Sequence, residues 1–151
     1  MSKKYLIVYF TRTGRTKSVA EYLQNELSAD CEEIIDKSNY KGGAGFLKGI
    51  VKSRAYTKIK DIKYIPSDYD EVIIMSPIWA DAITPAIRTY IKENCSNIAL
   101  ASIITTAMKS NLENVGKEWE KFSMNINKVL YINQIDDNSL LELKEKLVKN
   151  G

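Results

Sequence analysis

The sequence predicts one α/β domain, covering residues 1–151, built around a five-stranded parallel sheet. Short apolar runs alternate along the chain with segments whose apolar residues recur at helical spacing. The runs are almost continuously apolar, which is typical of strands buried on both faces of a parallel sheet. With 44% hydrophobic and 27% charged residues, the composition is that of an ordinary globular protein.

Five strands are expected, at residues 5–10, 31–35, 70–76, 98–105 and 128–132. The helices between them are expected at residues 17–27, 85–92, 112–122 and 139–149, with Pro85 in a first turn and Ser139 as an N-cap. This alternation suits a doubly wound sheet with the strand order 2-1-3-4-5 and right-handed crossovers. Ligands of such sheets bind outside the carboxyl ends of the strands. The candidate site is therefore formed by the loops that follow Phe10, Ser76 and Thr105.

Composition excludes several classes of chemistry. The chain has no histidine, which removes Ser-His and Cys-His catalysis and most zinc hydrolase sites. Its two cysteines, Cys31 and Cys95, form neither a disulfide framework nor a Cys-x-x-Cys metal or redox motif. A net charge of +3 is too small to indicate nucleic acid as a partner. We therefore expect no metal site and no catalytic acid or base, so that any redox chemistry comes from a cofactor.

The sequence also bears on location. No apolar run approaches the roughly 20 residues that span a bilayer, so an integral membrane protein is not expected. The N-terminal Met-Ser-Lys-Lys leads directly into the first strand and lacks the features of a secretory signal. A cytoplasmic location is the resulting expectation.

The loop after the first strand, Thr11-Arg-Thr-Gly-Arg-Thr16, is rich in donors for an anion. Three hydroxyls, free backbone N–H groups and the positive end of a helix dipole suit a phosphate dianion. The Walker and Gly-x-Gly-x-x-Gly patterns are both absent. Taken alone, the segment fits a phosphate-binding loop and a threonine-capped polar turn equally well.

The segment Val8-Tyr-Phe-Thr-Arg-Thr-Gly-Arg-Thr16 resembles the phosphate signature of flavodoxins, a Thr/Ser-x-Thr-Gly-x-Thr loop. Two further blocks, Gly45-Phe-Leu-Lys-Gly49 and the stretch from Ser76 to Tyr90, resemble short bacterial and archaeal members of that family. The resemblance implies a flavodoxin-like three-layer α/β/α sandwich that binds FMN. It places the phosphate among the residues of the first loop: Thr11, Arg12, Thr13, Gly14, Arg15 and Thr16.

The same resemblance assigns the other two loops to the isoalloxazine ring. Trp79, expected on an exposed loop tip, would stack on the ring, and backbone groups of Ile78, Ala80 and Asp81 would lie near its redox edge. Pro77, in the same loop, is also expected to bind the cofactor. Related loops usually have glycine where this chain has Asp81. The loop after the fourth strand would offer backbone groups to the pyrimidine edge from Thr105, Thr106, Ala107 and Met108. That loop is usually glycine-rich in the family, and here it is not.

The function implied by the resemblance is electron transfer through FMN between redox partner proteins. The alternative is an FMN-dependent oxidoreductase linked to NAD(P)H or a quinone, because the first loop also resembles the Thr-Arg-x-Gly-x-Thr loop of menaquinone-linked protoporphyrinogen oxidases. The sequence favours the electron carrier and leaves the enzyme open.

Overall fold

The computed structural model describes residues 2–37, 56–79, 82–106 and 112–149, and for residues 112–115 it describes the backbone only. Its strands are β1 (Tyr5–Tyr9), β2 (Asp30–Glu33), β3 (Glu71–Trp79), β4 (Ala82–Ile83), β5 (Ala101–Thr106) and β6 (Ile126–Ile132). Its helices are α1 (Arg15–Leu27), α3 (Pro85–Asn94), α4 (Leu112–Glu120) and α5 (Asp137–Val148), with two short 3-10 helices, η1 (Pro66–Asp68) and η2 (Cys95–Asn97).

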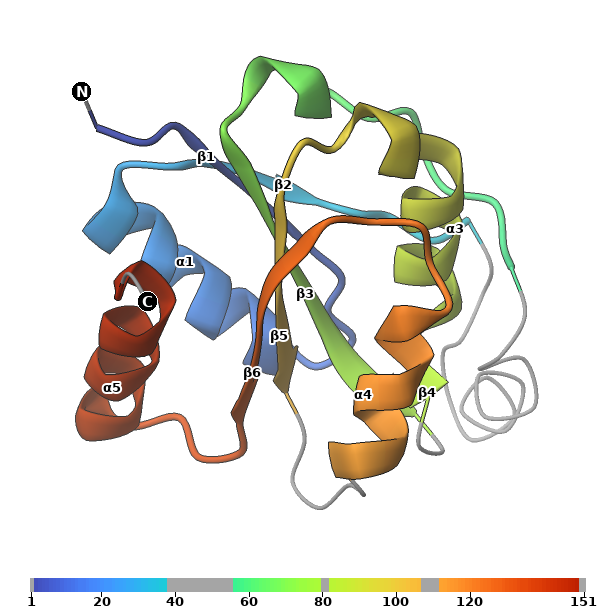
Figure 1. Cartoon of the computed structure of the whole chain (residues 1–151). Coiled ribbons are helices and arrows are strands. Elements are labelled where there is room, and N and C mark those ends of the chain that lie inside the picture. The colour runs from blue at the N-terminus through green and yellow to red at the C-terminus, as the bar shows by residue number, and fades with distance from the viewer. Residues whose placement is uncertain (1, 38–55, 80–81, 107–111, 150–151) are drawn as a thin grey trace.

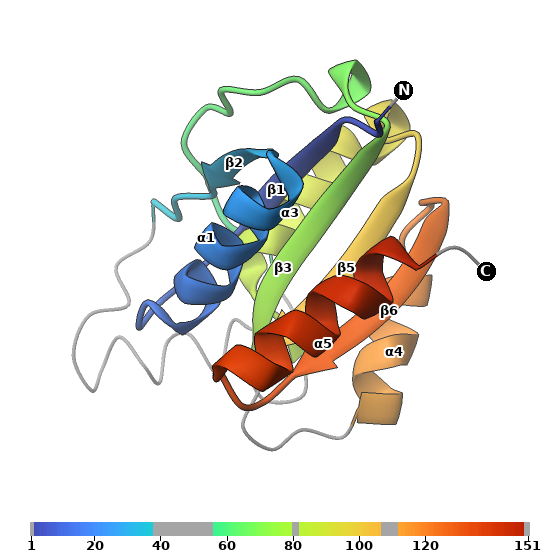
Figure 2. The ribbon, with the colours of Figure 1, turned by 90° about the vertical axis from the view of Figure 1, so that its left-hand side faces the viewer.

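The long strands form a parallel sheet in the order β2-β1-β3-β5-β6. Counted along the chain, these are the five expected strands in the order 2-1-3-4-5, so the prediction is confirmed. Helices α3 and α4 cover one face of the sheet, and α1 and α5 lie side by side over the other (Figures 1 and 2). The expected three-layer α/β/α sandwich is therefore present.

Alternation along the central strands divides the buried side chains between two cores. Leu6 and Val8 of β1 face the α3 side, whereas Ile7 and Tyr9 face α1 and α5. The α3 core also contains side chains of β3, α3 and α4: Val72, Ile74, Ala86, Ile87, Tyr90, Ile91 and Trp119. The α1 core contains the helical stripes of α1 and α5: Val19, Ala20, Leu23, Leu143 and Leu147. Burial on both faces explains why the strands are continuously apolar in the sequence.

The end of the third strand differs from the prediction. We expected the strand to stop at Ser76, but β3 continues through Pro77 and Ile78 to Trp79. The short strand β4 folds back on it, pairing Ile83 with Ile78 and Ala82 with Trp79 in antiparallel register. A proline usually marks the end of a central strand, and a two-residue strand has no periodicity to detect, so the sequence concealed this hairpin.

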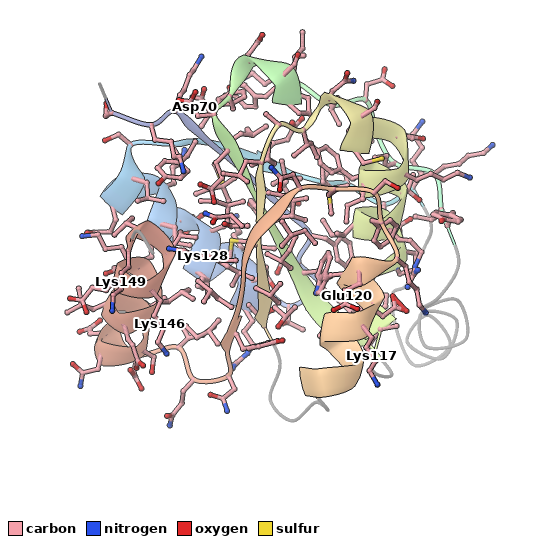
Figure 3. All side chains as sticks on the ribbon, in the orientation of Figure 1. Asp70, Lys117, Glu120, Lys128, Lys146 and Lys149 are labelled. Carbon is pink, nitrogen blue, oxygen red and sulfur yellow. The ribbon has the colours of Figure 1, made fainter. Side chains whose placement is uncertain are left out.

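Both ends of α5 are capped, although not as expected. The predicted N-cap Ser139 is wrong: Asp136 is the N-cap, and its carboxylate accepts the N–H of Ser139. At the other end, Lys128 of β6 extends across to the last turn of the helix (Figure 3) and donates to its carbonyl oxygens. Within the described ranges, no helix combines the length and apolar character needed to cross a bilayer.

Candidate functional site

Three chain segments meet at the carboxyl ends of the parallel strands. The register places Tyr9 of β1 opposite Met75 of β3, and Ser76 of β3 opposite Thr105 of β5. The segments that follow these residues therefore leave the sheet at the same edge, the lower end of the sheet in Figure 1. This is the edge at which the sequence located the candidate site.

The turn before α1 leaves the helix N-terminus open. Thr11 Oγ1 accepts the N–H of Gly14 at 3.0 Å, which closes the turn. Gly14 is the N-cap with φ of 92°, a left-handed conformation that glycine adopts most readily, and no side chain of the described residues caps the helix. The first turn of α1 also carries no acidic residue. Its backbone N–H groups and the positive end of the helix dipole are therefore available to an anion.

The first turn of α1 is fixed to the ends of two other strands. The hydroxyl of Thr16 lies 2.7 Å from the hydroxyl of Thr106, the last residue of β5, and both side chains are buried. Arg15 donates from Nη2 to the carbonyl oxygen of Asn133, immediately after β6. Arg15 Nε is buried without a hydrogen-bond partner among the described residues. The loop is thus held by residues far apart in the sequence, and the buried Nε of Arg15 has no partner among the described residues.

The indole of Trp79 lies beside the same turn. Phe10 packs edge-on against it, with ring centroids 5.6 Å apart and ring planes at 79°. The exposed guanidinium of Arg12 lies over the indole, with Cζ 5.9 Å from the ring centroid. Trp79 is half-buried at the end of β3, and is not on the exposed loop tip that we expected. The structure therefore joins a flat aromatic surface to the donor-rich turn through Phe10 and Arg12.

Three buried hydroxyls, those of Ser76, Thr84 and Thr105, lie near the carboxyl ends of β3 and β5. The hydroxyl of Ser76 lies 3.0 Å from that of Thr84 and accepts the Thr84 N–H, fixing the start of α3 to β3. Thr105, opposite Ser76 in the register, has its Oγ1 buried without a hydrogen-bond partner among the described residues. An unpartnered buried hydroxyl is costly, and it provides one polar group for a ligand or an ordered water.

Tyr9 contributes a neutral group near this edge. Burial raises the pKa of its phenol well above the usual range, and the nearby Glu33 carboxylate, which accepts its O–H at 3.3 Å, acts in the same direction. The phenol therefore remains protonated at neutral pH and donates to Glu33. This contact occupies one of the two neighbouring carboxylates, Glu32 and Glu33. The other, Glu32, accepts backbone N–H groups of Lys63 and Tyr64.

The predicted site residues divide into three groups. The first loop, Trp79 and Thr106 are connected by the contacts just described, while Pro77, Ile78 and Thr105 lie in the adjoining strand ends. Four others lie outside the described residues: Ala80, Asp81, Ala107 and Met108. Sequence reasoning missed Phe10, Asn133 and Thr84. The position of Asn133 after the last strand was the one available signal, because all parallel strands end at this edge.

Comparison with known proteins supports the fold. No family model and no curated protein matches the sequence. Among solved structures, a candidate flavoprotein from Bacteroides eggerthii DSM 20697 is 21% identical, with a TM-score of 0.81 over 99% of this chain and 100% of that one. A flavoprotein from Lactobacillus acidophilus NCFM, solved in complex with FMN, is 21% identical, with a TM-score of 0.73 over 95% and 99%. Oxidised flavodoxin 1 from Bacillus cereus is 13% identical, with a TM-score of 0.56 over 95% and 93%. The chain therefore has a flavodoxin-like fold, as the resemblance predicted.

Proposed function

We propose that this protein binds FMN at the carboxyl edge of its sheet and transfers electrons between redox partner proteins. The observation that carries the proposal is the open N-terminus of α1, where Gly14 leaves the first-turn N–H groups uncapped and no acidic residue is present. A similar protein, the Lactobacillus acidophilus flavoprotein, is solved with FMN. That similarity and the chemistry of the open turn support the same ligand.

At the phosphate end, the chain's own groups suit a dianion. The exposed hydroxyl of Thr13 and the first-turn N–H groups of α1 would donate to phosphate oxygens. The spare Nε donor of Arg15 would add a charge-assisted bond, while its Nη2 remains on Asn133. The buried Thr16 would act mainly by fixing the helix start to Thr106.

At the ring end, Trp79 would supply the aromatic surface, and the edge-on contact with Phe10 would fix the orientation of the indole. Thr105 would offer its unpartnered hydroxyl. Arg12, over the indole, would place positive charge beside the ring and favour negative charge on a bound ligand. When bound, FMN supplies the redox chemistry, while the protein tunes it and limits access.

The test is the absorption spectrum of the protein as purified, followed by titration of the apoprotein with FMN and with riboflavin. We expect yellow protein, or tight binding of added FMN, with riboflavin bound at least about tenfold more weakly because it lacks the phosphate. Arg15→Met should reduce FMN affinity and leave riboflavin affinity nearly unchanged. Lys144→Met is the control, because Lys144 of α5 pairs with Glu26 near the end of α1, away from the loop. A colourless protein that binds neither compound would overturn the proposal.

A second assay separates a carrier from an enzyme. The holoprotein is mixed anaerobically with NADH, NADPH, menadiol or protoporphyrinogen while the flavin absorption is followed. An electron carrier is expected to keep its absorption until a reductase protein is added. Rapid bleaching by one of these small molecules would favour the FMN-dependent oxidoreductase linked to a nicotinamide or a quinone.

A further inference from the structure

A buried ion pair connects the two helices on one face of the sheet. Arg88 Nη2 of α3 lies 2.6 Å from Glu118 Oε2 of α4, and the side chains are only 8% and 4% exposed. Lys121 Nζ lies 3.9 Å from the other carboxylate oxygen, and the ring centroid of Phe122 lies 5.9 Å from Arg88 Cζ. Such a pair loses much of its hydration, so packed apolar side chains in its place would often be equally stable. Stability alone therefore does not account for it.

Both partners of the pair belong to elements that hold the β3–β4 hairpin. Arg88 lies in the first turn of α3 and donates its N–H to the carbonyl of Thr84, whose own N–H is bound by Ser76 of β3. On the other side, α4 packs against β4. Ala82 of β4 pairs with Trp79 of β3. The ion pair thus joins the two helices that flank the hairpin on which Trp79 lies.

The described pairing of the hairpin is short. It consists of two residue pairs, Ile78 with Ile83 and Trp79 with Ala82. A pairing this short is not stable without packing against other elements. The packing comes from the α3 core, where the buried Trp119, the neighbour of Glu118, lies in the same cluster as Ile83 and the partly buried Trp79. Trp119 of α4, Ile83 of β4 and the indole of Trp79 therefore pack in one cluster.

We propose that Arg88 and Glu118 form a positioning pair that sets the location of Trp79 by fixing α4 against α3 and the β3–β4 hairpin. The inference rests on the proposed function in one respect, namely that Trp79 provides the surface for the flavin ring. A directional, charge-assisted bond specifies one separation of the two helices, whereas apolar side chains would allow several. Neither residue contacts the ligand in this scheme.

The first experiment needs no ligand. The protein is labelled with 5-fluorotryptophan, the ¹⁹F resonances of Trp79 and Trp119 are assigned with Trp79→Phe, and spectra of the apoprotein are recorded. In the double variant Arg88→Met/Glu118→Leu we expect the Trp79 resonance to shift or broaden while the fold is retained. Lys128→Met is the matched control, because it removes hydrogen bonds from the distant α5 and should leave the Trp79 resonance in place. An unmoved Trp79 resonance in a folded double variant would overturn the proposal.

The second experiment uses the holoprotein. In the double variant we expect the visible circular dichroism of bound FMN to change and the FMN dissociation constant to rise about three- to tenfold. The single variant Arg88→Lys keeps a positive charge at this position. Its circular dichroism and FMN dissociation constant should therefore lie between those of wild type and of the double variant. If the double variant does not fold, Glu118→Gln is measured instead, and unchanged signals in that variant count against the positioning role. If wild-type protein binds no FMN, the proposed function fails, while the ¹⁹F result still decides whether the pair positions Trp79.

Discussion

The hydroxyl oxygens of Thr16 and Thr106 lie 2.7 Å apart, in a buried contact between the first turn of α1 and the last residue of β5. Each hydroxyl has one proton and two lone pairs, so one threonine donates in this contact and the other keeps its proton for another acceptor. The side chains are 1% and 3% exposed, and water cannot easily replace either partner. The contact fixes the helix start whose N–H groups form the proposed anion site.

Removing one hydroxyl of this pair should destabilise the fold. In Thr106→Val, the hydroxyl of Thr16 stays buried without its partner, and the free energy of unfolding should fall by about 1–3 kcal/mol. Thr16→Val should have a similar effect. The double variant should lose less than the sum of the two, because an apolar pair of the same shape leaves no polar group unpaired. Urea unfolding of the apoprotein, followed by circular dichroism, measures all three.

The control for this cycle is Thr13→Val in the same loop, because Thr13 is exposed. Its free energy of unfolding should change by no more than about 0.5 kcal/mol. Strictly additive losses at Thr16 and Thr106 would show that the two hydroxyls do not interact.

Two glycines should respond in opposite directions to alanine. Gly14 has φ of 92°, and a Cβ there would meet nothing within 4 Å, so the cost of Gly14→Ala is conformational, about 1–2 kcal/mol. Gly116 lies inside α4, where a Cβ would be 3.7 Å from the hydroxyl of Tyr131, an ordinary contact. Gly116→Ala should therefore stabilise the protein by about 0.5–1 kcal/mol. Thermal unfolding of the two variants beside wild type is the measurement, and equal effects of the same sign would contradict it.

The sequence allowed the architecture to be predicted because the fold depends on patterns that are local. Strands buried on both faces must be apolar throughout, as Leu6, Ile7 and Val8 are, and α1 needs one apolar stripe, which Val19 and Leu23 supply. Element ends were less predictable. The start of α5 is fixed by the carboxylate of Asp136, although Ser139 has an equally good capping side chain. The choice between them depends on where β6 ends.

The candidate site was predicted as a set of loops, but its contacts were not. The carboxyl ends of parallel strands lie at the same edge of the sheet. The loops after Phe10, Ser76 and Thr105 could therefore be assigned to one site from the sequence. The hydrogen bond from Arg15 to the carbonyl oxygen of Asn133 could not be predicted. Every residue has a backbone carbonyl, and only the folded structure brings this one within reach of Arg15. The same holds for Arg88 and Glu118, on two helices whose packing no local pattern specifies.

The cap on α5 supplied by Lys128 should contribute to stability. Lys128 Nζ donates to the carbonyls of Lys146 at 2.8 Å and Leu147 at 2.9 Å, and also to that of Lys149. A cation at a helix C-terminus binds carbonyls that lack partners within the helix and interacts favourably with the helix dipole. Lys128→Met should lower the free energy of unfolding by about 1 kcal/mol. Urea unfolding measures this change.

The matched control is Lys146→Met. Among the described residues, the ammonium of Lys146 (labelled in Figure 3) pairs only with the exposed Glu142 of the same helix, at 2.8 Å. Removing this pair should cost no more than about 0.5 kcal/mol. If Lys146→Met were as destabilising as Lys128→Met, the cap would have no special role.

The thiol of Cys31 should be unreactive in the folded protein. Burial raises its pKa to about 11, and the nearby carboxylates of Glu21, Glu32 and Glu33 act in the same direction by disfavouring a second negative charge. Because the thiolate is the nucleophile, alkylation by iodoacetamide should keep accelerating up to about pH 11 in Cys95→Ser protein, where Cys31 is the remaining thiol. The same chain unfolded in urea, with the thiol near its ordinary pKa, should react at least about tenfold faster at pH 8. A rate that levelled off near pH 9 in the folded protein would contradict the shift, since it would mean that neither burial nor the three carboxylates affects this thiol.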